Sequence, residues 1–325
     1  MNSIRCTNLL WSRRSLVWGS TRNAMATRKI RTILVGVLAP EERSQPAVER
    51  AAKLAAAFRA ELILFHAALE PAISGRSLFD SRRLAALRGA VVATRRAMLE
   101  KLCAQLQARG ITARCAVVWE DPPYAAVIRA AIRDNADLVV IGAHRPRASR
   151  LPILRQNDWE LMRYCSRPLL IVRQPVKRSG AVVAAVDPSH ANDKPAALDV
   201  ELAKAGAVLA AGLNTELHVA HCIPDSAFPL GHITPKDRLR MKRERQARVE
   251  EVLEKARVDA RKVHMLDGLV EVALPVLLRK VHAQALVLGA LSRRWLQGFV
   301  VGNTAERLIH ETTCDLLIVK PAGFK

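Results

Sequence analysis

The sequence predicts an α/β protein with two tandem domains, each an open, doubly wound sheet of five parallel strands in the order 3-2-1-4-5. Three observations predict this architecture. The chain has 325 residues, about twice the length of an ordinary domain. One sequence pattern occurs twice along it. Within each copy, short apolar runs alternate with longer amphipathic stretches, which is typical of helices packed on both faces of a parallel sheet.

The repeat is visible in segments that keep a constant spacing. Gly142 and Gly289, each at the end of an apolar run, are separated by 147 positions. Leu169 and Leu316, which begin two identical LLIV runs, have the same separation. A third pair of runs, Ile33–Leu38 and Val182–Val186 near the start of each copy, is taken to differ from this spacing by one residue. Segments in register indicate duplication of one domain.

Residues 29–174 form the first predicted domain, 175–180 the linker and 181–325 the second domain. Pro175 and Gly180 interrupt the pattern at the linker. Residues 1–28 are a separate extension that contains no acidic residue, because the first one in the chain is Glu41. The extension is interpreted as an overlong gene start, with Met25 as the natural start, or as a targeting segment.

The first copy contains five apolar runs of strand length. They are expected as strands at 32–38, 61–66, 112–119, 137–142 and 169–173. Ser44, as cap residue, and Pro46 are expected to open its first helix, and Ser81–Arg109 carries a long helical pattern.

The second copy repeats this order. Its strands are expected at 181–187, 216–221, 263–267, 285–289 and 316–320. Asp193 and Pro195 are expected to open its first helix, and a long charged helix is expected at Lys236–Arg261. In such a sheet, ligands bind beyond the carboxyl ends of the strands where the strand order reverses, between strands one and four.

The two loops at that point in the second copy carry a specific pattern. The first strand ends in Asp187, followed by Pro188 and Ser189. The fourth strand ends in Gly289, and the pattern continues through Ser292, Arg293, Gly302, Asn303 and Thr304. A carboxylate can accept hydrogen bonds from ribose hydroxyls or an adenine amine, a glycine lets the backbone approach a ligand, and a helix N-terminus suits phosphate.

This pattern resembles the nucleotide signature of the universal stress protein family, in its tandem-domain form. In that signature, Gly, two residues, Gly and nine residues precede Gly followed by Ser or Thr. Gly289 and Gly302 match its first and third glycines, whereas Ser292 replaces the second glycine and Asn303 the hydroxyl residue. The resemblance implies a flavodoxin-like, HUP-type fold and a stress-response protein. It also implies ATP or a related adenine nucleotide as a regulatory ligand, with Asp187 contacting the adenosine.

The first copy has lost these features. Ala39 is taken to stand where the carboxylate should be, and no glycine occurs in the stretch 154–159. We therefore expect no ATP there and a structural role, pairing with the second copy within the chain. His144, Arg145 and Arg147 either hold another anion or form a solvated loop.

Metal binding and catalysis are not predicted. His218 and His221 have odd spacing on an expected strand and so face opposite sides, with Cys222 diverging from His221. The sequence has no P-loop, dinucleotide fingerprint or nucleophile elbow. We predict a non-enzyme, with slow ATP hydrolysis left open.

The formal charge of +21 leaves a polyanion-binding function as a weaker alternative. The basic cluster at Lys236–Arg261 is interleaved with acids and has no aromatic residues, so it is interpreted as a solvated face and nucleic acid is not expected as a partner. No apolar run reaches the ~18 residues of a membrane helix, so a soluble, cytoplasmic protein is expected. A non-nucleotide interaction scaffold, a homodimer and protein partners in stress signalling stay open.

Overall fold

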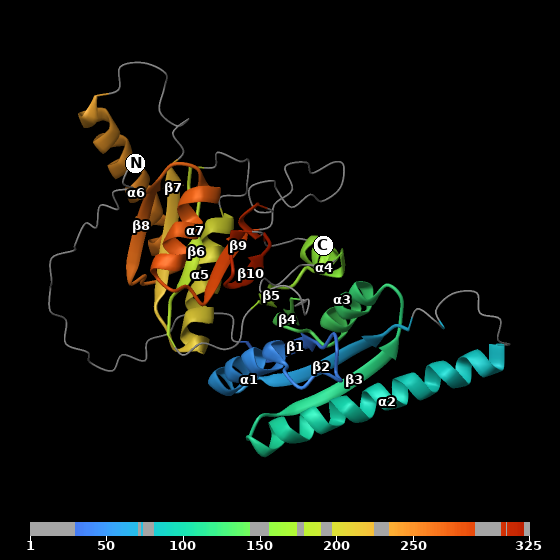
Figure 1. The fold of residues 1–325 in the computed structure, drawn as a ribbon. Coiled ribbons are helices and arrows are strands. Elements are labelled where there is room, and N and C mark those ends of the chain that lie inside the picture. Colours follow the sequence, from blue (N-terminus) through green and yellow to red (C-terminus); the bar gives the residue numbers. More distant parts are fainter. Residues whose placement is uncertain are drawn as a thin grey trace.

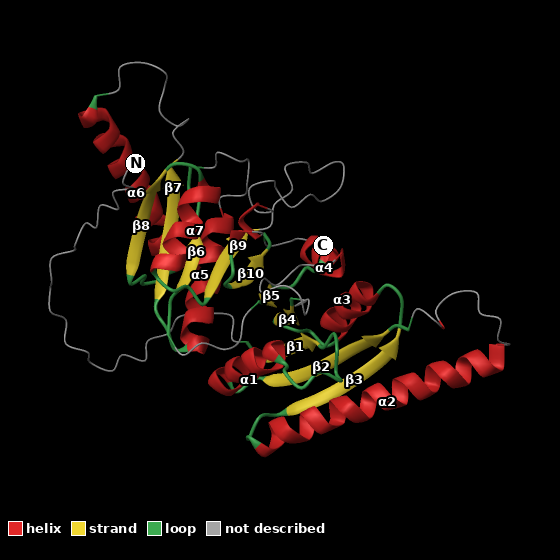
Figure 2. Ribbon diagram, viewed as in Figure 1, coloured by secondary structure: helices red, strands yellow, loops and turns green. Residues whose placement is uncertain are grey.

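The computed structural model describes most of the chain beyond residue 29. The described residues are 30–70, 73, 81–143, 156–173, 179–189, 197–223, 234–289, 307–309 and 311–321. They form ten strands in one sheet, with helices on both faces (Figures 1 and 2).

The first half contains five strands joined by helical crossovers. Its elements are β1 (Thr32–Gly36), α1 (Pro46–Phe58), β2 (Glu61–Ala68), α2 (Ser81–Ala108), β3 (Ala113–Trp119), α3 (Pro123–Arg133), β4 (Leu138–Gly142), α4 (Gln156–Tyr164) and β5 (Leu169–Val172). β1 pairs in parallel with β2 and β4, so the strand order is β3-β2-β1-β4-β5.

The second half repeats the same order. Its elements are β6 (Val182–Ala185), α5 (Ala197–Leu213), β7 (Leu217–Ile223), α6 (Pro235–Ala256), β8 (Lys262–Asp267), α7 (Val270–Lys280), β9 (Ala285–Gly289) and β10 (Asp315–Val319). Its strands lie in the order β8-β7-β6-β9-β10, so both halves have the predicted 3-2-1-4-5 arrangement. The predicted fold class is confirmed.

The two halves are joined edge to edge. β5 pairs with β10 in antiparallel orientation, whereas every other described strand pair is parallel. The ten strands therefore make one continuous sheet, and the two domains are related by an approximate twofold axis at the β5–β10 seam (Figure 1).

Alternate side chains of each strand enter two different cores. In β1, Ile33 and Val35 face the layer of α1, α2, α5 and α6, whereas Leu34 faces the layer of α3, α4 and α7. The first of these cores runs without a break across both domains, because α1 packs against α5. Burial on both faces explains why the strands are continuous apolar runs.

Helix boundaries differ from the sequence predictions in two places. α1 begins at Pro46 as expected, but its N-cap residue is Gln45 rather than Ser44, and no side chain caps it. The Gln45 amide instead donates to the carbonyl of Ala39, 2.7 Å away. α6 begins at Pro235 with a capping box between Thr234 and Asp237 and ends at Ala256, five residues before the predicted end. Asp193 and Pro195 lie outside the described residues.

Candidate functional site

The predicted site lies at the carboxyl edge of the second domain. β6 is hydrogen-bonded to β7 on one side and to β9 on the other, so the chain leaves β6 and β9 in opposite directions. Asp187 follows the end of β6 by two residues, and Gly289 is the last residue of β9. The structure therefore places both at the reversal point where an open α/β sheet binds ligands.

Asp187 is held by its backbone, which leaves its carboxylate for other contacts. Its N–H donates to Oδ1 of Asp199, 2.8 Å away, and Asp199 is fully buried on α5. The side chain of Asp187 is 30% exposed. A carboxylate on a backbone held in place, and itself open to solvent, is suited to accept hydrogen bonds from a ligand.

His221 lies directly beneath this loop. Its Nδ1 lies 3.0 Å from the carbonyl oxygen of Val186, which fixes the proton on Nδ1, and 3.9 Å from Oδ1 of Asp187. Burial lowers the pKa of His221, against the opposing effects of the Val186 carbonyl and Asp187. The ring is therefore neutral near pH 7 and orients the loop without neutralising Asp187.

Arg245 adds a cation to the same loop. It reaches from α6 to donate from Nη1 to Oγ of Ser189, 2.7 Å away. From the sequence pattern alone, Arg245 is expected among the solvated basic residues of its helix. Nothing in the helical pattern singles it out, because its contact depends on how α6 packs against α5.

Packing explains why position 289 is a glycine, independently of any ligand. A Cβ at this position would lie 2.7 Å from Cδ2 of Leu198 and 3.6 Å from Cδ1 of Leu202. The glycine therefore lets α5 approach the end of β9. The remaining predicted site residues, Ser292, Arg293, Gly302, Asn303 and Thr304, lie outside the described residues, and Pro188 lies in the turn with Ser189.

The first domain keeps the histidine but lacks the carboxylate. His66 occupies the position of His221, with Nδ1 2.7 Å from the carbonyl oxygen of Val37. In the same register, Leu38 stands where Asp187 stands, and it is 47% exposed. The prediction that placed Ala39 there was wrong by one residue, because the first strands are offset by 149 positions rather than by the 147 of the later ones. His144, Arg145 and Arg147 lie outside the described residues.

The histidines and cysteine of β7 do not converge. His218 contacts His264 on the face covered by α7, whereas His221 contacts Val186 on the opposite face. Burial raises the pKa of Cys222 to about 12, so it is a buried thiol rather than a thiolate ligand. Within the described ranges, no three His, Cys, Asp or Glu side chains gather as a metal ion would require.

Comparison with known proteins assigns the chain to a family. Residues 29–173 and 180–320 each match the Universal stress protein family. The chain belongs to this family. Universal stress protein E of Photorhabdus laumondii is 27% identical over 300 residues, covering 90% of this chain and 96% of that protein. Universal stress protein E of Escherichia coli K12 is 28% identical over 298 residues, covering 89% and 94%.

The solved structures show the same tandem fold. A putative universal stress protein from Pseudomonas aeruginosa superposes with a TM-score of 0.70 at 21% identity, covering 91% of this chain and 95% of that one. In this tandem universal stress protein, the two matched domains span nearly the whole chain. Among the described helices, none is long and apolar enough to cross a bilayer.

Proposed function

We propose that the second domain binds ATP or a related adenine nucleotide as a regulatory ligand in a stress response. The observation that carries this proposal is the Asp187 carboxylate at the strand-order reversal point. It is fixed through its backbone by buried Asp199 and remains open to solvent. Asp187 also matches the aspartate of the family's nucleotide signature.

Among the described residues, one would supply hydrogen-bond acceptors and another would supply positive charge for the ligand. Asp187 would accept hydrogen bonds from ribose hydroxyls or the adenine amine. Arg245, which holds Ser189, places positive charge on the same side of the loop for an anionic ligand. The residues from Ser292 to Thr304 complete the signature in sequence, and their contribution to phosphate binding stays a prediction.

The proposed role is binding rather than catalysis. A His221 ring that donates to a backbone carbonyl and has a lowered pKa is engaged as an orienting group rather than as a general base. Slow ATP hydrolysis is tested in the same preparation by following released phosphate.

A scaffold role is the second candidate, and Leu38 favours it in the first domain. An exposed leucine stands there in place of the carboxylate, which favours an apolar contact over a nucleotide at that position. If the second crevice were also inactive, both domains would serve partner proteins. Three further statements stay proposals. The first domain ends at residue 174 and the second begins at residue 181, the protein forms a homodimer, and it is located in the cytoplasm.

The test is nucleotide content followed by substitution at Asp187. Purified protein is denatured, released nucleotides are analysed, and ATP affinity is measured by calorimetry. Asp187→Ala should weaken binding by about 10- to 100-fold, because it removes a charge-assisted hydrogen-bond acceptor of ~1.5–3 kcal/mol.

Asp259→Ala is the matched control, because Asp259 is exposed in the same domain but precedes β8 at the opposite edge. It should leave ATP affinity unchanged. If the wild-type protein released no nucleotide and ignored added ATP, the scaffold function would replace the nucleotide proposal.

A further inference from the structure

A cavity lies at the amino edge of the second domain, opposite to the edge that carries Asp187. Its volume is about 370 Å³, and residues that precede or begin β6, β7 and β8 line it together with the end of α7. Its polar lining includes Glu216, His218, Lys262, His264 and Lys280. It is separated from the Asp187 crevice by the length of the strands.

Two basic side chains that line this cavity have no acidic partner among the residues that the structure describes. Lys262 begins β8 and Lys280 ends α7. Neither lysine forms an ion pair with any residue in the part of the chain that the structure describes. The one carboxylate of the lining, Glu216, is engaged by Arg261 Nε at 3.3 Å and lies 3.5 Å from Nε2 of His218.

A pair of histidines on the neighbouring strands β7 and β8 also lines the cavity. Nε2 of His264 and Nδ1 of His218 are 3.2 Å apart, so one ring donates its N–H to the other. Burial, His218, Lys262 and Lys280 together lower the pKa of His264 to about 4. Burial is the largest of these causes, and the smaller contribution of Lys262 and Lys280 is a positive potential that also attracts an anion.

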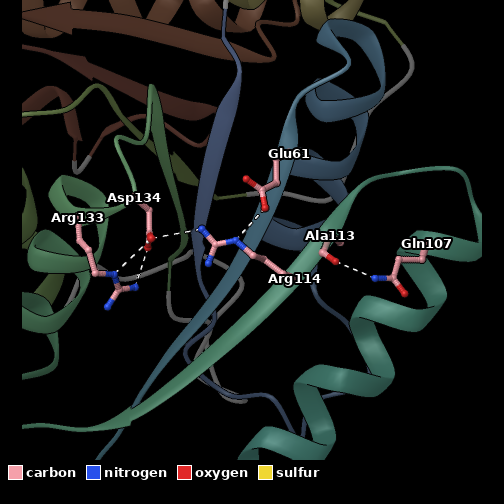
Figure 3. A network of polar contacts seen from close by, with 6 residues as sticks. All are labelled: Glu61, Gln107, Ala113, Arg114, Arg133 and Asp134. Carbon is pink, nitrogen blue, oxygen red and sulfur yellow. Dashed lines mark hydrogen bonds and ion pairs between the residues drawn. The ribbon is translucent and has the colours of Figure 1, made fainter.

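At the equivalent position of the first domain, a carboxylate lies between two basic side chains. By strand register and helix ends, Arg114 corresponds to Lys262, Arg133 to Lys280 and Asp134 to Val281. Figure 3 shows the Asp134 carboxylate between both arginines. Its oxygens lie 3.3 Å from Arg114 Nη2 and 2.7 Å from Arg133 Nη2.

The second domain has removed that carboxylate and replaced the apolar residues behind it. Val281 stands in place of Asp134, and the positions of Ile63 and Ala116 are taken by His218 and His264. Two cations and two nitrogen-bearing rings thus surround a cavity where the other domain has a carboxylate. The helix end does not exclude an anion, because the carboxylate of Asp134 itself occupies the end of α3.

We propose that this cavity binds the oxyanion group, phosphate or carboxylate, of a small metabolite, with Lys262 and Lys280 as the principal ligands. His264 donates to the bound group once the anion has raised its affinity for a proton. His218, held by Glu216, orients His264. The volume of the cavity accommodates a small molecule but not a macromolecule.

The test follows the histidine ring protons by nuclear magnetic resonance while inorganic phosphate or acetate is added to the full chain. Phosphate should produce a saturable shift of the His264 signal with a Kd of about 1–10 mM, and it should raise the pKa of His264 from its low value. The signal is assigned by its loss in His264→Ala. A stronger response to acetate would identify the natural ligand as a carboxylate, and a stronger response to phosphate as a phosphate ester.

Three variants decide the assignment. Lys262→Gln and Lys280→Gln should each weaken binding about tenfold, as expected for the loss of one charge-assisted contact. Val281→Asp should abolish it by supplying the carboxylate that the first domain already has, and should not lower the unfolding temperature. Lys101→Gln, on α2 of the first domain, is the matched control and should not change the response.

The outcome is independent of nucleotide binding at the other edge. Asp187→Ala should leave the phosphate response intact. The proposal is overturned if the His264 signal does not respond to either anion, or if the response persists in Lys262→Gln, Lys280→Gln and Val281→Asp. In either case the ATP affinity measured by calorimetry would be unaffected.

Discussion

At the scale of single residues, buried histidines set how the protein responds to acid. Burial lowers the pKa of His66, His218, His221 and His264. The unfolded chain therefore binds protons more readily than the folded chain below the ordinary histidine pKa of 6.5. The contribution of the neutral histidines to the free energy of unfolding is therefore complete above that pH. It is lost as the pH falls toward their folded-state pKa values, and for His264 this pKa is about 4.

His264→Ala should reduce this acid sensitivity. Between about pH 7 and about pH 4.5, the wild-type protein should lose ~2 kcal/mol more unfolding free energy than the variant, because the variant has no His264 to protonate on unfolding. Alanine is the residue that the first domain carries at this position, at Ala116, so it fits the strand. Urea unfolding at both pH values measures the difference.

His282→Asn is the control for that experiment. His282 is exposed with a φ of 50°, a conformation that asparagine tolerates, and it should leave the pH dependence unchanged. An acid sensitivity equal in wild type and His264→Ala would show that the lowered pKa of His264 does not contribute.

At the scale of elements, the contact between α1 and α5 carries the joint core. Gly212, near the end of α5, lies against Leu54 and Phe58 of α1. A Cβ at Gly212 would come within 2.6 Å of Phe58 and 2.7 Å of Leu54. The absence of a side chain at this position is therefore what lets the first helices of the two domains meet.

Gly212→Ala should destabilise the protein by about 1–3 kcal/mol through overpacking. Gly89→Ala is the opposite case, because Gly89 is exposed on α2 and a Cβ there would meet nothing within 4 Å. It should stabilise by about 0.5–1 kcal/mol through helix propensity alone. Chemical denaturation of both variants checks the signs, and equal signs would contradict the packing argument.

At the scale of the whole molecule, a buried polar network crosses the seam between the domains. Arg50 of α1 is fully buried, with Nε 2.9 Å from Oδ2 of Asp315 and Nη1 3.2 Å from Oε1 of Gln284. The backbone N–H of Arg173, after β5, donates to Oδ1 of the same aspartate, 2.8 Å away. Asp315 at the start of β10 is thus bound from both sides by the first domain.

Arg50→Leu should cost about 3–5 kcal/mol, because it removes one member of the buried ion pair between Arg50 and Asp315. Since the loss falls on the seam, heat unfolding should change from one transition for the whole chain to two, one per domain. Differential scanning calorimetry measures this. Arg109→Leu, which breaks an exposed pair with Glu49, is the control and should cost less than about 1 kcal/mol. A single unshifted transition in Arg50→Leu would show that the network does not couple the domains.

The sequence predicts the strands, the repeat and the strand order well, because buried parallel strands are continuous apolar runs and duplication repeats them in register. It misplaces local details that depend on single contacts. Gln45 rather than Ser44 precedes α1 because its amide reaches a carbonyl, and Leu38 rather than Ala39 replaces Asp187 because the loops differ in length. The roles of Asp199 and Arg245 follow from how α5 and α6 pack, which periodicity does not encode. The Asp187 and Gly289 positions were predicted, and ligand binding there stays a prediction.

The antiparallel pairing of β5 with β10 also has a genetic consequence. When two identical chains pair through such an edge, each mutation alters both crevices at once, and any gain at one is imposed on the other. Here the paired halves are encoded by separate stretches of one gene, so each substitution is inherited by one half only. Asp187 in place of Leu38, and Val281 in place of Asp134, are differences between equivalent positions that a pair of identical chains cannot have. Covalent fusion thus lets one protein combine two dissimilar halves in fixed one-to-one proportion.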